Sequence, residues 1–280
     1  MDELTRTALA AADAAAAVHR RDWGRIVLEG ATEKGRADYV SQTDLDAQQA
    51  ALSVIRARYP DHGILAEEDP RSVAERVAAW DGSPLWVVDP LDGTANFLHG
   101  HPQFAASVAV AVDGRPAAGA VAAAVTGERW WAARGRGAFK NGRPIRVSDR
   151  RQLRDALVGT GFPFKLLHRL PEFLGQLDRV LRSSSGVRRA GAASLDLCYL
   201  AQGSLDAFWE LILHPWDFAA GWLLIEEAGG VLVKLDGSPL ELGDHAVMGA
   251  NSPELLEALA AVVSSPTPLP SPRRRSPPRR

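Results

Sequence analysis

The chain has 280 residues and 46% apolar content, which is enough for one large globular domain or two closely packed halves. Its formal net charge is −2, but five arginines lie in residues 266–280, so the preceding part carries −7. Such an acidic body disfavours general attraction to nucleic acid, and it binds an anionic substrate only where metal ions or backbone dipoles overcome the repulsion.

Membrane and disulfide-bonded proteins are also disfavoured. No apolar run reaches 18 residues, and the acidic, alanine-rich N-terminus lacks the basic start and cleavage site of a signal peptide. We therefore expect a cytoplasmic protein that does not bind a membrane. The single cysteine, Cys198, has no partner for an internal disulfide and lies in an apolar segment, where burial is expected rather than catalysis.

The N-terminal region predicts two helices. An alanine-rich helix is expected over residues 4–20, and a second helix follows an extended segment from residue 35 and stops at Tyr59-Pro60. Thr43 and Asp46 are expected to form the capping box of the second helix. Its buried face is expected to carry Leu45, Leu52 and Ile55.

An antiparallel sheet is expected next. Residues 85–88 form a short buried strand that ends at Asp89, and residues 104–112 alternate large apolar residues with alanine or serine. The meander continues through 119–125 and 128–133 and closes beyond an Asn-Gly turn at 141–142. The first half is therefore predicted to be α+β.

In the second half, helices and strands alternate as in an α/β fold. Strands are expected at 155–162, 206–211, 231–235 and 245–250, and helices at 168–184, 191–204, 217–230 and 252–263. We predict three parts: an N-terminal α+β half that carries the metal-binding motifs (1–147), a C-terminal α/β half (148–263) and a disordered Pro/Arg-rich tail (264–280).

The stretch WVVDPLDGTANF, residues 86–97, carries two carboxylates out of the buried strand. Because Pro90 keeps the chain extended, the side chains of Asp89 and Asp92 and the Leu91 carbonyl can converge on one point. Oxygen ligands without cysteine or paired histidine favour Mg²⁺, Mn²⁺ or Ca²⁺ over zinc or copper. The competing interpretation of the stretch is a polar turn.

The residues that follow suit a phosphate. The backbone N–H groups of Gly93 and Thr94 can donate to phosphate oxygens if a helix or tight turn begins there. The two aspartates are three residues apart, whereas the D-x-D-G-T phosphatases that form a phospho-aspartate space them by two, so we reject a covalent aspartate mechanism. His99 and His101 are interpreted as part of a polar loop rather than a zinc site.

Three motifs in this order resemble the inositol monophosphatase family of Mg²⁺-dependent, lithium-sensitive phosphatases: ILAEED at 64–69, WVVDPLDGTANF at 86–97 and HPWDFAAGWLLIEEAGG at 214–230. The resemblance covers residues 5–263. It implies a layered αβαβα sandwich of the inositol monophosphatase and fructose-1,6-bisphosphatase type, with the site between the two halves. It also implies a homodimer, which the sequence itself does not show.

The resemblance implies a set of metal ligands. Two or three Mg²⁺ ions, for which Mn²⁺ can substitute, would be bound by the carboxylates of Glu67, Asp89, Asp92 and Asp217 and by the Leu91 carbonyl. Asp217 also lies at the start of an apolar helix, where a carboxylate is an ordinary N-terminal cap.

The same resemblance assigns catalysis to Glu67, Asp89 and Thr94. Glu67 and the Thr94 hydroxyl would orient the attacking water, and the phosphate would rest on the Gly93 and Thr94 amides. Lys34 and Asp44, before the second helix, resemble the loop that gates a third metal. Substrate contacts are implied at Asp92, Gly93, Thr94, Gly191, Ala193, Glu210 and Asp217, although Glu210 is equally well explained as a solvated acid at a strand end.

The first functional hypothesis is a Mg²⁺-dependent phosphomonoesterase that hydrolyses myo-inositol monophosphate or a similar polyol phosphate. Alternative enzymes of the same superfamily act on histidinol phosphate, fructose 1,6-bisphosphate or a 3′-phosphoadenosine nucleotide, and the metal motif does not separate them. A different class is an RNA or transcription accessory protein that uses the arginines of the tail as a basic arm. The acidic body opposes that interpretation, so nucleic acid is not an expected partner.

Overall fold

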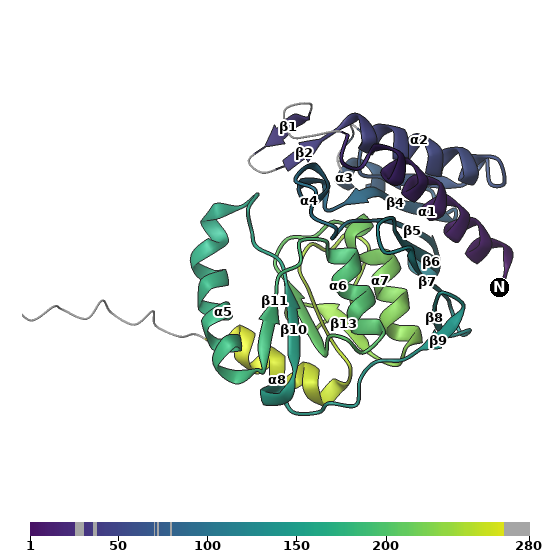
Figure 1. Cartoon of the computed structure of the whole chain (residues 1–280). Helices are drawn as coiled ribbons and strands as arrows, with labels where there is room; N and C mark the ends of the chain where they lie inside the picture. Colours follow the sequence, from purple (N-terminus) through teal and green to yellow (C-terminus); the bar gives the residue numbers. More distant parts are fainter. Residues whose placement is uncertain (26–30, 36–37, 70, 72, 79, 266–280) are drawn as a thin grey trace, which may run out of the picture.

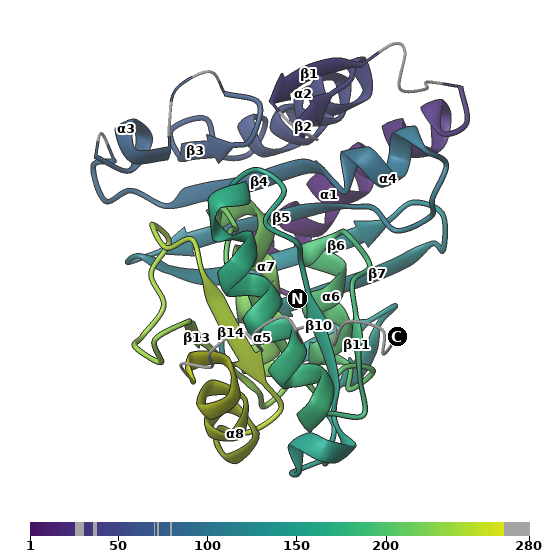
Figure 2. The same cartoon turned by 90° about the vertical axis from the view of Figure 1, so that its left-hand side faces the viewer.

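The structure, a computed structural model, describes residues 1–25, 31–35, 38–69, 71, 73–78 and 80–265. Within this part of the chain, two mixed sheets alternate with three pairs of helices to give five layers (Figures 1 and 2). The predicted αβαβα sandwich is confirmed. The arginine-rich tail lies outside the described residues, and no helix among the described residues is both long and apolar enough to cross a membrane.

The first layer consists of helices α1 (Glu3–Asp22) and α2 (Gln42–Arg56), which pack against each other and against the first sheet. Asp2 caps α1 by accepting a hydrogen bond from the Thr5 backbone N–H at 2.8 Å. The helix faces the sheet with small side chains, which let it lie close to the strands. These alanines are at most 1% exposed: Ala8, Ala11, Ala12, Ala15 and Ala16.

The start of α2 differs from the sequence prediction. Ser41 is the cap, and its backbone N–H and hydroxyl donate to the Asp44 carboxylate at 2.8 and 2.6 Å. The predicted capping box of Thr43 and Asp46 is therefore wrong by two residues. Leu45, predicted to be buried, is 46% exposed, because the buried face runs through Asp44 and successive helical residues point about 100° apart.

The first sheet has the strand order β3-β4-β5-β6-β7-β8-β9, and only β3 and β4 are parallel. Even-numbered residues of β5 contact the core beneath α1 and α2, and odd-numbered ones contact the core on the opposite face. The sheet is therefore buried on both sides. The bounds are β3 Gly63–Ala66, β4 Leu85–Asp92, β5 Ala105–Val112, β6 Arg115–Ala123, β7 Glu128–Ala133, β8 Ala138–Lys140 and β9 Arg143–Ile145.

The middle layer consists of α6 (Ala193–Ala201) and α7 (Pro215–Glu227), which pack between the two sheets. The second sheet has the order β11-β10-β12-β14-β13, in which β10 is parallel to both of its neighbours. Its strands are β10 Leu157–Thr160, β11 Gly186–Arg188, β12 Ala207–Glu210, β13 Val231–Lys234 and β14 Val247–Ala250.

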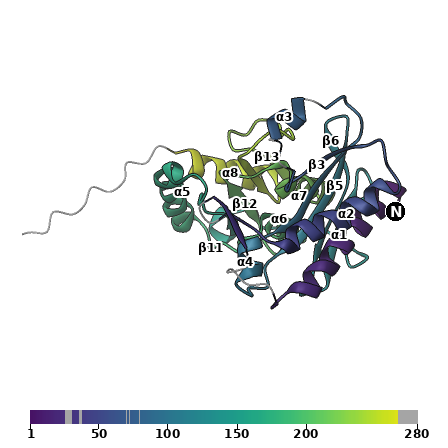
Figure 3. The ribbon, with the colours of Figure 1, turned by 90° about the horizontal axis from the view of Figure 1, so that it is seen from above.

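The last layer is formed by α5 (Leu170–Ser183) and α8 (Pro253–Ser264), which lie beside each other on the side away from α1 and α2 (Figure 3). The Ser252 hydroxyl caps α8 by accepting from the Leu255 backbone N–H at 3.2 Å. The predicted boundary at residue 147 falls between the last strand of the first sheet and the first strand of the second. A division into separate domains stays a prediction, and the core around α6 and α7 is continuous across that boundary.

Short elements account for most of what the sequence did not predict. The extended segment before α2 forms a hairpin of β1 (Thr32–Gly35) and β2 (Asp38–Val40). Strand β3 and the short helix α3 (Val73–Ala78) were not predicted, nor was strand β11. A further short helix, α4 (Thr94–Leu98), directly follows the strand that carries the two aspartates.

Two glycine-to-alanine substitutions test the packing of the middle layer. A Cβ at Gly221 in α7 would lie 2.5 Å from the Leu197 Cβ of α6, whereas a Cβ at Gly175 in α5 meets only the flexible end of Arg179 at 3.3 Å. We expect Gly221→Ala to lower the free energy of unfolding by about 1–3 kcal/mol. Gly175→Ala should raise it by about 0.5–1 kcal/mol, because alanine has the higher helix propensity. Urea unfolding of both variants measures the difference, and equal effects would contradict the packing described here.

Candidate active site

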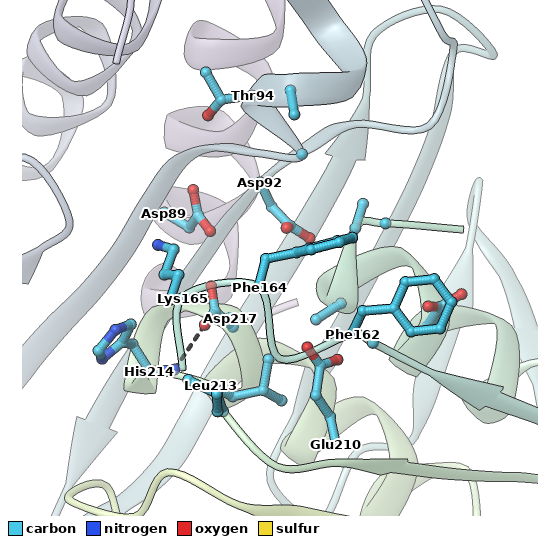
Figure 4. A pocket seen from close by; sticks show the side chains of 18 of the residues that line it. Asp89, Asp92, Thr94, Phe162, Phe164, Lys165, Glu210, Leu213, His214 and Asp217 are labelled. Carbon is cyan, nitrogen blue, oxygen red and sulfur yellow. Dashed lines mark hydrogen bonds between the residues drawn. The ribbon is translucent and has the colours of Figure 1, made fainter. Parts of the chain in front are cut away.

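A cleft of about 440 Å³ opens between the two sheets, where β3, β4, β10 and β12 end and α6 and α7 begin (Figure 4). It is lined by all ten residues that the sequence analysis assigned to metal binding, catalysis or substrate contact. This set does not include Lys34 and Asp44, which were assigned to a gating loop. The ten are Glu67, Asp89, Leu91, Asp92, Gly93, Thr94, Gly191, Ala193, Glu210 and Asp217. The fold thus gathers segments that are far apart in the sequence, while the role of each residue remains a proposal.

Three aspartates form the centre of the cleft. One carboxylate oxygen from each of Asp89, Asp92 and Asp217 lies within 4.8 Å of the other two, and Figure 4 shows the three side chains pointing into the same space. Burial, reinforced by the charges of Glu67 and the other two aspartates, raises the pKa of Asp89 well above its usual value. Burial and the Asp217 charge raise the pKa of Asp92 to about 7.

A β-bulge at the end of β4 gives the two aspartates of this strand their positions. Asp89 pairs with Ser107 of β5, but Asp92 pairs with Ala105, so three steps on β4 face two steps on β5. The Asp89 carboxylate accepts a hydrogen bond from the Leu91 N–H at 3.0 Å. Because of the bulge, the Leu91 carbonyl lies outside the regular hydrogen-bond ladder between β4 and β5. Leu91 forms part of the wall of the cleft.

Glu67 reaches the cluster because β3 runs parallel to β4 and ends beside it. The Glu67 N–H donates to the Val88 carbonyl at 3.1 Å, which continues the pairing by one residue. Its carboxyl group forms a side-chain hydrogen bond with Asp89. A fourth acid therefore joins the three aspartates.

Asp92 and Asp217 also hold the N-termini of the two middle helices. Helix α6 has no side-chain cap of its own, and Asp92 accepts hydrogen bonds from the Ser194 N–H at 2.7 Å and hydroxyl at 2.6 Å. Asp217 accepts from the His214 N–H at 2.6 Å within the capping box of α7. Asp217 is thus not the N-cap itself, which is His214, but the third helical residue, whose side chain caps the N-terminus as part of the capping box. This position is compatible with a ligand role, because one of its carboxylate oxygens also belongs to the three-aspartate cluster.

A helix does begin at Thr94, which is the condition that the sequence set for phosphate binding. Gly93 is its N-cap, with φ of 89°, and a Cβ there would lie 2.8 Å from the Gln103 carbonyl oxygen. The Thr94 hydroxyl lies 2.9 Å from a carboxylate oxygen of Asp44 and 3.0 Å from the Leu91 carbonyl oxygen. Since both groups are acceptors, the hydroxyl proton is directed at one of them, and a lone pair of the oxygen stays available to accept.

The expectation that Asp44 belongs to a loop before the second helix is wrong. It is fully buried in the first turn of α2, because it completes the Ser41 cap, and burial raises its pKa to about 6. Lys34 lies in β1, and its side chain lies outside the described residues. The structure therefore does not test the prediction that Lys34 belongs to a loop that gates a third metal.

The opposite wall of the cleft comes from the second sheet. Glu210 at the end of β12 lies over the backbone of Gly161, and burial raises its pKa well above the usual value. Phe162 and Phe164 are 38% and 40% exposed at the mouth. The Arg189 guanidinium lies over both rings, 5.2 and 4.9 Å from their centroids.

Several residues of the cleft were not found from the sequence. Lys165 points toward Asp89 (Figure 4), and its charge lowers the pKa of Asp217 against the larger effect of burial. The contact between Asp92 and Ser194 beside the cleft was also not found, although a helix that starts with Gly-Ala-Ala lacks a cap and needs a carboxylate from elsewhere. His214 also lines the cleft, as does His99, which the sequence analysis interpreted as part of a polar loop.

The donor set fits a hard divalent cation. Four carboxyl groups and a backbone carbonyl offer only oxygen, and a zinc-type set of cysteine or paired histidine is missing from the three-aspartate cluster. The raised pKa values record the free energy cost of placing these acids together. A divalent cation would offset that cost, so the cluster is suited to bind metal.

The chain is similar both to proteins named inositol monophosphatase and to proteins named SuhB. A model described as the inositol monophosphatase family matches residues 1–267. The Nus factor SuhB of Pseudomonas aeruginosa is 44% identical over 253 residues, or 89% of this chain and 92% of that protein. The inositol-1-monophosphatase of Rhizobium meliloti is 42% identical over 250 residues, or 89% and 91%. The crystal structure of the extragenic suppressor protein suhB from Bartonella henselae superimposes with a TM-score of 0.85 at 36% identity, over 94% of this chain and 99% of that one.

The raised pKa values predict how stability depends on pH. In the unfolded chain these carboxyls ionise near pH 4, whereas in the folded protein Asp92 keeps its proton up to about pH 7. Unfolding therefore releases protons, and in EDTA the thermal midpoint should fall as the pH rises from 5 to 8. Asp89→Asn should show a shallower fall, because one carboxyl with a raised pKa is missing and the charge that it adds near the neighbouring acids is removed.

Added Mg²⁺ should reverse this trend, because metal and protons compete for the same carboxylates. Differential scanning fluorimetry should find a larger increase in midpoint at pH 8 than at pH 5. A midpoint that does not respond to Mg²⁺ at either pH would contradict a metal centre here.

Proposed function

The chain belongs to the inositol monophosphatase family, and on this basis we propose that it is a Mg²⁺-dependent phosphomonoesterase acting on myo-inositol monophosphate or a similar polyol phosphate. The observation that carries the proposal is the group of three aspartates, whose oxygens lie within 4.8 Å of one another beside the N-terminus of α4. A phosphate is itself anionic, so binding it next to these acids requires cations. The whole site therefore favours a metal-dependent reaction of an anionic ester.

Metal ions would be held by Glu67, Asp89, Asp92, Asp217 and the Leu91 carbonyl. Two or three Mg²⁺ ions, or Mn²⁺ in their place, would supply Lewis acidity for the phosphoryl group, a lowered pKa for a water molecule and compensation of the leaving group's charge. Water then attacks phosphorus, the ester P–O bond breaks, and the products are inorganic phosphate and the free alcohol. No side chain of the protein forms a covalent intermediate.

The chain's own residues orient the reactants. The Thr94 hydroxyl donates a hydrogen bond to Asp44 and can accept a hydrogen bond from the attacking water, while Glu67 accepts a hydrogen bond from the other O–H of that water. As the water attacks, Glu67 can take up one proton, and one proton reaches the leaving alcohol oxygen, so that the free alcohol and inorganic phosphate are formed. The phosphate would rest on the N–H groups of Gly93 and Thr94, where the backbone of residue 93 approaches without a Cβ. Asp44 thus receives a different role from the one that the sequence suggested, as the partner that orients the Thr94 hydroxyl.

The second sheet would bind the alcohol part of the ester. Glu210 offers a carboxyl group to vicinal hydroxyls, and Gly191 and Ala193 offer backbone groups on the adjacent wall. Histidinol phosphate, fructose 1,6-bisphosphate and a 3′-phosphoadenosine nucleotide remain alternative substrates. Kinetics on a panel of these four esters decides among them.

Three further properties follow the family pattern and remain predictions. These are inhibition by lithium, assembly as a homodimer and a cytoplasmic location. A lithium titration of the phosphatase activity measures the inhibition, and size-exclusion chromatography with light scattering measures the oligomeric state.

A second candidate function is a role as an RNA or transcription accessory protein. It is favoured by the name of the Pseudomonas aeruginosa relative, a Nus factor, and by the five arginines of residues 266–280. The acidic body opposes RNA binding, so the tail would have to supply it.

Replacement of one aspartate tests the enzymatic proposal. Asp89→Asn should lower kcat/KM for inositol 1-phosphate in Mg²⁺ by about a thousandfold, the equivalent of about 4 kcal/mol of transition-state stabilisation. Phosphate release measures it, with Asp236→Asn in the exposed turn after β13 as the control. Turnover by the wild-type protein in EDTA would refute the mechanism.

Removal of residues 266–280 separates the two candidate functions. We expect full phosphatase activity from the truncated chain, because every proposed active-site residue precedes position 218. Filter binding to a single-stranded RNA in 0.05 and 0.2 M salt measures the other function. RNA binding that is lost on truncation would support the accessory role.

A further inference from the structure

Histidine 19 of α1 contacts the backbone of the metal-binding motif from the outer layer. Its Nε2 lies 2.7 Å from the carbonyl oxygen of Pro90, between Asp89 and Leu91 in the sequence. The side chain is fully buried. Because a carbonyl only accepts hydrogen bonds, Nε2 carries the proton and the ring donates to Pro90.

The ring is held in place by aromatic neighbours. Its centroid lies 5.8 Å from that of Phe104 in an edge-on arrangement and 6.3 Å from that of Phe97. Its Nδ1 is buried and has no hydrogen-bond partner among the residues that the structure describes. A residue that only filled this space would do better as leucine, since an unpartnered buried nitrogen is unfavourable. The hydrogen bond to the Pro90 carbonyl therefore explains why a histidine occupies this position.

The carbonyl that His19 binds lies inside the β-bulge. The bulge removes the Pro90 and Leu91 carbonyls from the regular ladder, and proline has no N–H to anchor this peptide. Along an extended chain, successive carbonyls point in opposite directions. Holding the Pro90 carbonyl toward α1 therefore directs the Leu91 carbonyl toward the cleft.

We propose that His19 is a positioning residue that fixes the backbone between Asp89 and Asp92 and thereby sets the Leu91 carbonyl for metal binding. The inference rests on the proposed function, since it concerns the metal centre of that site. His19 contacts neither substrate nor metal, and it acts through the Pro90 peptide. The outer helix layer thus contributes to the metal affinity of a cleft on the other face of the sheet.

Isothermal titration calorimetry of the metal-free protein with Mn²⁺ alone tests the proposal. His19→Leu keeps the volume but loses the donor, and we expect Mn²⁺ to bind about tenfold more weakly, as is typical when a residue that orients a ligand is removed. His19→Gln places an amide N–H near the position of Nε2, so its affinity should return toward the wild-type value. Thr7→Val is the matched control, because it alters a fully buried polar residue of the same helix whose hydroxyl donates to the Glu3 carbonyl within α1 and not to Pro90.

The outcomes separate this inference from the proposed function. Equal Mn²⁺ affinity in wild type, His19→Leu and Thr7→Val would overturn the positioning role, and so would equal losses in His19→Leu and Thr7→Val. If His19→Leu does not fold, His19→Asn and His19→Gln decide, because the asparagine amide is too short to reach Pro90 and only Gln should bind like wild type. Wild-type protein that binds no Mn²⁺ would instead refute the proposed function itself.

Discussion

Repulsion among acids brought together at the end of a buried strand is the constraint on which the structure depends. Asp89, Asp92 and Asp217 lie close together, and burial raises the pKa of each, with neighbouring carboxylate charges adding to the effect at Asp89 and Asp92. A fold that only had to be stable would place these side chains apart. The surrounding elements hold them together, and the cluster is therefore suited to bind a divalent cation.

The acids are held by hydrogen bonds that also stabilise the fold. One oxygen of Asp92 receives two hydrogen bonds from Ser194, and Asp217 receives one from the His214 backbone. These bonds fix each carboxylate before any ligand arrives, which reduces the reorganisation needed on binding. The same side chains thus stabilise helix starts and form the acidic cluster, so the hydrogen bond of Asp217 to the N-cap of α7 is compatible with its proposed ligand role.

Much of the fold could be predicted because the patterns are local. The alanine face of α1, the alternation along β5 and the Ser252 cap of α8 each reflect a short stretch of sequence. The motif of residues 86–97 identified the centre of the site for the same reason. What could not be predicted depends on contacts between distant segments: Ser194 lies 102 residues from Asp92, and Lys165 reaches the cluster from a loop without a distinctive pattern. Asp44 was expected in a loop on the basis of the family resemblance, whereas the pattern around it had not shown that Ser41 caps the helix and that Asp44 closes this cap.

The borrowed cap of α6 has a consequence for how the molecule can be divided. Helix α6 begins without a cap of its own, and the carboxylate that satisfies its first turn comes from a strand of the other sheet. A fragment starting at residue 148 would carry an open helix end and an apolar surface that normally lies against β5 and β6. We therefore expect neither piece to fold on its own, because the contact surface between the two halves passes through the cleft.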